Sequence, residues 1–100
     1  MNELSAPYLA ETRRLTLAAL HGLPVKVFLF GSRATGAAGR HSDIDIAVLP
    51  LGELPVAALA GLRERLEESH VPYQVDVVDL ATAEPALRRR VLAEGVPWSA

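Results

Sequence analysis

Hydrophobic positions along the chain recur either at every second residue or at every third to fourth residue. The period of two residues predicts three β-strands. Residues 25–30 (VKVFLF) are β-branched and aromatic, which is typical of a largely buried strand. Residues 43–49 (DIDIAVL) alternate, so the two acids fall on one face and the isoleucines on the other. Residues 73–80 (YQVDVVDL) form a third apolar stretch, with an acid in its middle. We expect one strand in each stretch.

Apolar residues at spacings of three and four predict helices between the strands. The first covers residues 4–20, the second residues 55–69, and the third follows Thr82 as its N-cap, with Pro85 in its first turn. A short helical turn is expected within residues 33–38. The predicted buried positions are Tyr8, Thr12, Leu15 and Ala19 in the first helix, Leu59, Leu62 and Leu66 in the second, and Leu87 and Val91 in the last.

The connections between the strands predict how the strands pair. A turn-rich loop joins the first two, which favours antiparallel pairing, and a helix joins the second to the third, which favours parallel pairing. The order α-β-α-β-α-β-α then gives an α/β (α+β) fold: a small mixed three-stranded sheet flanked by helices. We expect residues 1–100 to form a single domain.

Composition and charge narrow the classes of function. Half of the residues are hydrophobic, which is enough for a core. No apolar run reaches the ~18–20 residues of a membrane helix, and the first residues do not resemble a secretory signal. The chain has no cysteine, so we expect neither disulfides nor thiolate metal sites, and we expect a cytoplasmic protein. The formal net charge of −2 does not favour direct nucleic-acid binding.

The expected topology brings acids and a glycine-rich turn together. Antiparallel pairing of the first two strands places Gly31 and Ser32 beside Asp43 and Asp45. The two acids project from one sheet face, about 6–7 Å apart along the strand. A parallel third strand can add Asp76 to the same face.

Three converging carboxylates would repel one another, and a divalent cation would remove the conflict. Oxygen ligands without histidine or cysteine favour Mg²⁺ or Mn²⁺. Near such an ion, Gly31 would let the backbone approach a phosphate, Ser32 would donate a hydrogen bond, and Arg33 would add positive charge. Two ions would suit an attack on a nucleotide phosphate.

Structural explanations compete with this functional one. Asp43 and Asp45 can be ordinary acids at the edge of a strand. Asp79 is an alternative to Asp76, although it has the opposite strand parity and suits the end of the strand. The run of arginines at residues 88–90 can bind RNA or an acidic partner, or form the solvated face of a helix.

The site motif resembles that of the DNA polymerase β-type nucleotidyltransferase superfamily: GS, a spacer, D-x-D, and a later acid in a strand. Here the spacer has ten residues, 33–42. The matching residues are Gly31, Ser32, Asp43, Asp45 and Asp76. Within the superfamily the chain is similar to the minimal nucleotidyltransferases, through GSRATG, SDIDIAVL, VDVVDL and RRRVLAEGVPW. This resemblance covers most of the chain from residue 25 onward.

The resemblance implies a metal-dependent transfer of NMP, usually AMP from ATP, to a hydroxyl, with release of pyrophosphate. It implies that Asp43 and Asp45 bridge metal and triphosphate, and that Asp76 binds metal near the acceptor. Minimal members resemble antitoxins encoded beside a HEPN-domain toxin, and some adenylylate a tyrosine of that toxin.

Larger members of the superfamily add a domain that closes over the base and the acceptor, and this chain has no residues for one. We therefore expect a homo-oligomer or a complex with a HEPN-type toxin. Two alternatives to the protein adenylyltransferase are an antitoxin that neutralises its partner by contact alone and an adenylyltransferase of small molecules such as antibiotics.

Overall fold

A four-stranded sheet forms the centre of the computed structural model, which describes residues 6–36, 39 and 42–99. The strands are β1 (Val25–Phe30), β2 (Ile44–Pro50), β3 (Val75–Asp79) and β4 (Val96–Pro97). Their order across the sheet is β3-β2-β1-β4, so β2 lies in the interior and β3 at one edge.

The pairing of the three predicted strands is confirmed. β1 and β2 are antiparallel, and β2 and β3 are parallel. The two-residue β4 was not predicted. It pairs antiparallel with β1, through Phe28 with Pro97 and Leu29 with Val96. Glycine and proline, here Gly95 and Pro97, are typical of the end of a helix, and so short a strand has no periodicity from which to predict it.

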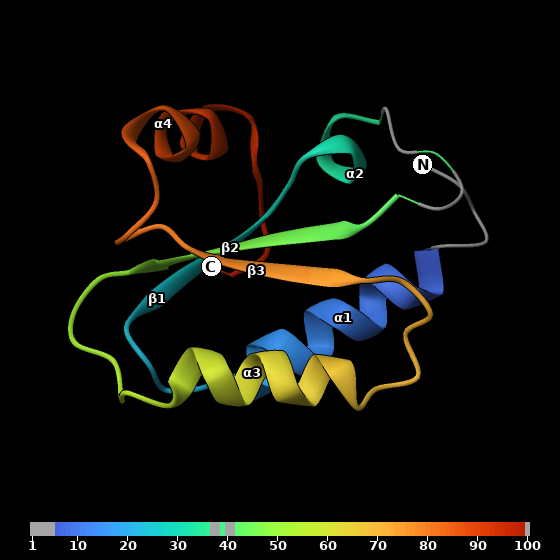
Figure 1. The fold of residues 1–100 in the computed structure, drawn as a ribbon, viewed down its shortest axis with the longest axis horizontal. Helices are drawn as coiled ribbons and strands as arrows, with labels where there is room; N and C mark the ends of the chain where they lie inside the picture. Colours follow the sequence, from blue (N-terminus) through green and yellow to red (C-terminus); the bar gives the residue numbers. More distant parts are fainter. Residues whose placement is uncertain (1–5, 37–38, 40–41, 100) are drawn as a thin grey trace.

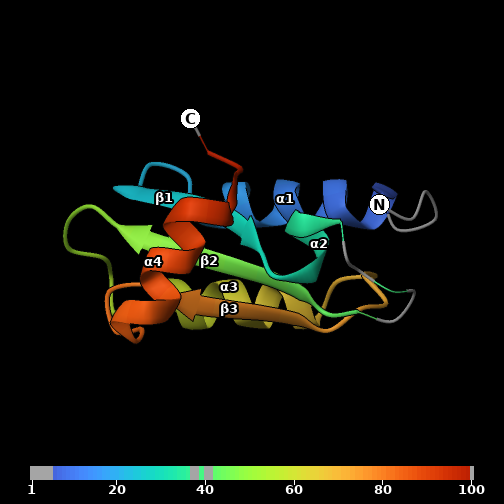
Figure 2. The same cartoon turned by 90° about the horizontal axis from the view of Figure 1, so that it is seen from above.

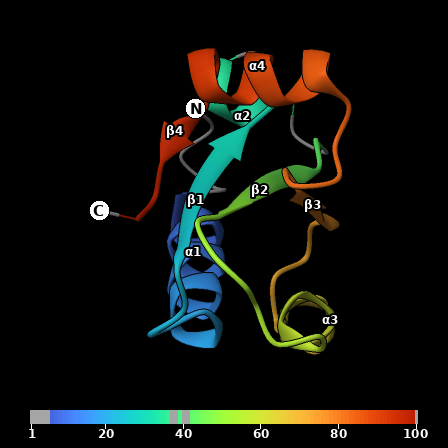
Figure 3. The ribbon, with the colours of Figure 1, turned by 90° about the vertical axis from the view of Figure 1, so that its left-hand side faces the viewer.

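Helices cover both faces of the sheet (Figures 1 and 3). α1 (Ala6–Ala19) and α3 (Ala58–Glu67) lie side by side under one face. The short α2 (Ser32–Thr35) and α4 (Pro85–Glu94) lie over the other face, as the view from above shows (Figure 2). Residues 4, 5, 37 and 38, which we included in predicted helices, lie outside the described residues.

The larger core lies between the sheet and the α1–α3 layer. Leu62 and Leu66 of α3 are buried in it, as predicted, and Leu59 packs against it. The other buried members are Leu9, Leu20, Val27, Leu29, Ile44, Ile46, Val48, Val77 and Trp98.

The buried stripe of α1 is confirmed in part. Thr12 is buried as predicted, and Leu15 and Ala19 pack against the core. Tyr8, however, is 38% exposed, and Leu9 and Thr16 are buried instead. Both threonines satisfy their hydroxyls within the helix: Thr12 Oγ1 donates to the carbonyl of Tyr8, and Thr16 Oγ1 donates to that of Thr12, each at 2.7 Å. A buried hydroxyl with such a partner carries little penalty, which explains why hydrophobicity alone did not predict the burial of Thr16.

A smaller core joins α4 to the other face of the sheet. Its buried members are Phe28, Ala47, Leu80 and Val91, and Leu87 packs against them. Pro85 begins α4 as predicted. The predicted cap was wrong: Glu84 is the N-cap, and the Thr82 hydroxyl donates instead to the carbonyl of Asp79, at 3.3 Å.

None of the helices within the described residues has both the length and the apolar character needed to cross a bilayer.

Candidate functional site

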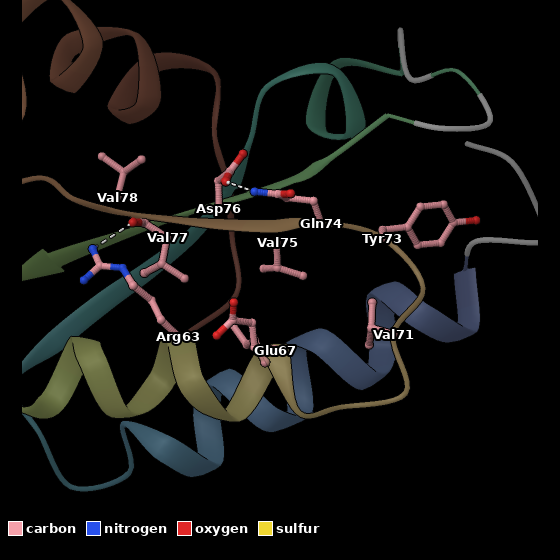
Figure 4. A pocket seen from close by; sticks show the side chains of 10 residues that line it. Arg63, Glu67, Val71, Tyr73, Gln74, Val75, Asp76, Val77 and Val78 are labelled. Carbon is pink, nitrogen blue, oxygen red and sulfur yellow. Dashed lines mark hydrogen bonds between the residues drawn. The ribbon is translucent and has the colours of Figure 1, made fainter.

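Asp45 and Asp76 are neighbours across the parallel pair β2–β3. The register aligns them directly, and it also aligns Asp45 with Phe30 at the end of β1. Figure 4 shows Asp76 pointing to the sheet face that carries α2 and α4. Residues that are aligned in adjacent strands project to the same face, so the two carboxylates lie on one surface.

Electrostatics place Asp43 in the same neighbourhood. Burial is the largest cause that raises the pKa of the Asp45 carboxyl above its ordinary value, followed by the negative charges of Asp76 and then Asp43. The positive charge of Arg33 acts in the opposite direction. Asp45 therefore lies among more negative charge than positive charge, as expected for converging carboxylates.

The charges of Asp76 and Asp43 both act on Asp45, but the three aspartates do not form a metal cluster. Among the described residues, no three acidic, histidine or cysteine side chains are arranged closely enough to hold one metal ion. Asp76 Oδ1 instead accepts a hydrogen bond from Gln74 Nε2, at 3.2 Å (Figure 4). The donors fit a hard divalent cation, because they are carboxylate oxygens and because the negative charges of Asp76 and Asp43 lie near Asp45.

Gly31 lies against the carboxylate of Asp45. Its backbone has φ 74° and ψ −156°, a combination almost restricted to glycine. A Cβ atom at this position would collide with Asp45 Oδ2. The predicted proximity of the Gly31–Ser32 turn to the acids is thus confirmed, whereas phosphate binding by these two residues stays a prediction.

Arg33, predicted as a phosphate ligand, is buried and contacts other parts of the protein. Its side chain is only 4% exposed. Its Nε and Nη2 donate to the carbonyl of Ser42, at 3.0 and 2.5 Å, and Nε also reaches the carbonyl of Asp43 at 3.3 Å. The guanidinium carbon lies 4.4 Å from the ring centroid of Tyr73. The guanidinium is used within the protein, and phosphate binding by Arg33 stays a prediction.

A cleft of about 650 Å³ runs along the outer edge of β3, beside α3. Asp76 and Gln74 line it on one side of the strand and Arg63 on the other (Figure 4). It gives a second molecule access to the strand that carries Asp76.

The remaining candidates have structural positions. Asp79 Oδ1 accepts a hydrogen bond from the amide of Ala81, at 2.9 Å, so it caps the turn after β3. Arg88, Arg89 and Arg90 are exposed on α4. Neither Tyr73 nor the inward direction of Arg33 had a signal in the sequence, because their contact joins residues forty positions apart.

Comparisons with known proteins agree with this geometry. A protein adenylyltransferase, MntA of Shewanella oneidensis, is 41% identical over 69 residues, which are 69% of this chain and 49% of the relative. The chain spans about half the length of the curated relatives it matches.

Two solved structures have the same fold. One is a chain of a toxin–antitoxin complex with AMP-PNP, with a TM-score of 0.69 and 32% identity over 88% of this chain and 73% of that one. The other is a chain of the complex between a tri-AMPylated Shewanella oneidensis HEPN toxin and an MNT antitoxin. Its TM-score is 0.62, with 29% identity over 100% of this chain and 73% of that one.

The family described as polymerase beta, nucleotidyltransferase matches residues 11–97. That range includes the Gly31–Ser32 turn and all three aspartates. The chain therefore belongs to the polymerase β nucleotidyltransferase family.

Proposed function

We propose that this chain transfers AMP from ATP to a hydroxyl of a HEPN-type toxin and so acts as the antitoxin of a toxin–antitoxin pair. The alignment of Asp45 with Asp76, beside Gly31, is the observation that carries the proposal. The relative named as a protein adenylyltransferase and the complex that contains an AMPylated HEPN toxin support it.

Asp43, Asp45 and Asp76 are the residues that would hold divalent metal, Mg²⁺ or Mn²⁺, and two ions suit this chemistry. When bound, such ions neutralise charge on the triphosphate and make the acceptor hydroxyl more acidic. Burial, followed by the negative charges of Asp76 and Asp43, raises the pKa of the Asp45 carboxyl, and a bound cation would offset those charges.

The reaction needs an acceptor oxygen in line with the α-phosphorus of ATP. The acceptor oxygen forms a bond to that phosphorus, the bond to the bridging oxygen of the β-phosphate breaks, and pyrophosphate leaves. Asp76 accepts the hydroxyl proton in this proposal. Its place beside the open cleft along β3 gives the acceptor a route to its carboxylate.

The turn after β1 would hold the triphosphate. Gly31 carries no side chain, so the backbone can approach a phosphate while Asp45 stays close. Ser32 begins α2 and is partly exposed, so its hydroxyl is free to turn toward a phosphate oxygen. We place the reaction in the cytoplasm, where ATP and Mg²⁺ are abundant.

The toxin would supply the acceptor and complete the site, so we propose a hetero-complex as the working assembly. The test is transfer of label from α-labelled ATP to a HEPN-type partner with Mg²⁺ present. We expect Asp45→Asn to abolish labelling and Asp79→Asn, the matched control at the end of β3, to retain it.

Toxin neutralisation distinguishes the two modes of antitoxin action. We expect Asp45→Asn to lose neutralisation together with labelling. Neutralisation that survives the substitution would overturn the enzymatic mechanism and show that contact alone inhibits the toxin. Labelling by the Asp45→Asn variant at the wild-type rate would show that Asp45 does not take part in AMP transfer.

A further inference from the structure

Arg33 links three segments that surround the acidic site. It belongs to α2, it donates to the carbonyls of Ser42 and Asp43 ahead of β2, and it stacks on Tyr73 ahead of β3. Its side chain is almost fully buried. A guanidinium that is removed from water needs such partners, so these contacts hold Arg33 in one orientation.

Asp43 is the aspartate of the three that lies outside the sheet. Asp45 belongs to β2 and Asp76 to β3, so the ladder fixes their backbones. Asp43 precedes β2, and its backbone carbonyl accepts a hydrogen bond from Arg33 Nε. The first bond from β2 toward β3 comes one residue later, from the amide of Ile44 to the carbonyl of Gln74 at 2.9 Å.

The Tyr73 ring provides the platform for Arg33. It is partly buried, and Tyr8 of α1 meets it edge-on, with ring centroids 5.8 Å apart and an interplanar angle of 69°. Figure 4 shows Tyr73 in the segment just before β3, close to one end of α1. The platform is thus anchored to the layer on the other side of the sheet from α2.

We propose that Arg33 is a positioning residue, which fixes the backbone at Ser42–Asp43 so that the Asp43 carboxylate stays near Asp45 and Asp76. The inference rests on the proposed function insofar as these carboxylates share a cation. The role proposed for the guanidinium depends on its shape, because two of its nitrogens reach the carbonyl of Ser42 while the group lies over the ring of Tyr73. A lysine ammonium keeps the charge but cannot make this set of contacts.

Hydrogen exchange in the protein without nucleotide or metal tests the positioning directly. We expect Arg33→Lys to speed amide exchange at residues 42–44 and to leave β1 unchanged. Arg13→Lys is the matched control, because Arg13 Nη2 also donates to a backbone carbonyl, that of Trp98, at 3.1 Å. Unchanged exchange at residues 42–44 in Arg33→Lys would overturn the inference, whatever the chain catalyses.

Metal affinity tests the consequence. Titration of Mn²⁺ in the presence of AMP-PNP should show about 10- to 100-fold weaker binding in Arg33→Lys, as is typical when a residue that orients a ligand is lost. Wild-type affinity in this variant would overturn the inference, because charge alone would then suffice. If the wild-type chain itself does not bind Mn²⁺, that result counts against the proposed function. The hydrogen-exchange experiment still decides whether Arg33 positions the backbone.

Two substitutions of Tyr73 distinguish a loss of positioning from simple misfolding of the Arg33→Lys variant. Tyr73→Phe keeps the ring and should retain both the wild-type exchange and the wild-type affinity. Tyr73→Leu removes the ring and should reproduce the Arg33→Lys result. Equal behaviour of the Phe and Leu variants would contradict the stacking contact.

Discussion

The carboxylate of Asp45 lies directly against the backbone of Gly31, in the space that a Cβ atom would enter. This contact joins the turn after β1 to the middle acid of the site. Two requirements meet at Gly31: a backbone conformation that is almost restricted to glycine, and room for a carboxylate.

Gly31→Ala should impair both stability and activity. We expect a loss of about 1–3 kcal/mol in the free energy of unfolding from the strained backbone, and the added methyl group should also displace Asp45 and strongly reduce AMP transfer. Urea unfolding and the labelled-ATP assay measure the two effects.

Gly36→Ala is the control for that change. Gly36 has a left-handed backbone, with φ 79° and ψ 5°, but a Cβ there would meet no described atom within 4 Å. It should lower stability by about 1–2 kcal/mol and leave transfer intact. Equal losses of transfer in the two variants would show that backbone strain, not the contact with Asp45, controls activity.

The raised pKa of Asp45 predicts how stability changes with pH in the absence of metal. The folded state binds the Asp45 proton more tightly than the unfolded chain does, in which the carboxyl has its ordinary pKa of 3.8. The contribution of this group to stability therefore falls as the pH rises from that value through the raised pKa, and stays low at neutral pH.

Asp45→Asn should remove that unfavourable contribution. We expect an unchanged or higher free energy of unfolding at neutral pH, by at most about 1 kcal/mol because the carboxyl remains partly solvated. Urea unfolding of the variant and the wild type across a pH series measures the difference. Marked destabilisation at neutral pH would mean that Asp45 is a structural partner.

Ligand binding should reverse the order of stability between these two proteins. A ligand that binds only the folded state stabilises it by about 2.7 kcal/mol at 100 times its Kd. Mg²⁺ with AMP-PNP should therefore raise the Tm of the wild type but not that of Asp45→Asn, and chelation of Mg²⁺ should abolish the rise. A rise of similar size in the variant would exclude Asp45 from the metal site.

Arg63 protects the open edge of the sheet. Its Nη2 donates to the outward-facing carbonyl of Val77 in β3, at 3.0 Å (Figure 4). Exposed edge strands can pair with other chains, and a charge at the edge hinders this. Arg63→Gln should therefore increase self-association and lower stability by about 1 kcal/mol.

Sedimentation velocity at increasing protein concentration would detect this association. Arg65→Gln is the matched control, because Arg65 is an exposed arginine of the same helix. Equal self-association of both variants would show that the loss of one positive charge, and not the loss of the contact with Val77, causes it.

Sequence patterns predicted the parts of the fold that depend on local chemistry. Alternation in residues 43–49 placed Asp45 and Ala47 on one face, and the connecting segments gave the direction of each strand pair correctly. Local patterns identified Thr12 but missed Thr16 in the buried stripe of α1, because the Thr16 hydroxyl is satisfied by the carbonyl of Thr12, which hydropathy does not take into account.

By itself, the sequence determined three of the four strands, the order of the elements up to α4 and the choice of Gly31, Asp43, Asp45 and Asp76 as site candidates. These follow from periodicity and residue chemistry, which act over a few neighbouring positions. Only the tertiary structure decided that Arg33 turns inward onto Tyr73, that β4 joins the sheet, and that Asp76 rather than Asp79 faces Asp45. The physical reason is that each of these depends on the register and packing of segments that are distant along the chain.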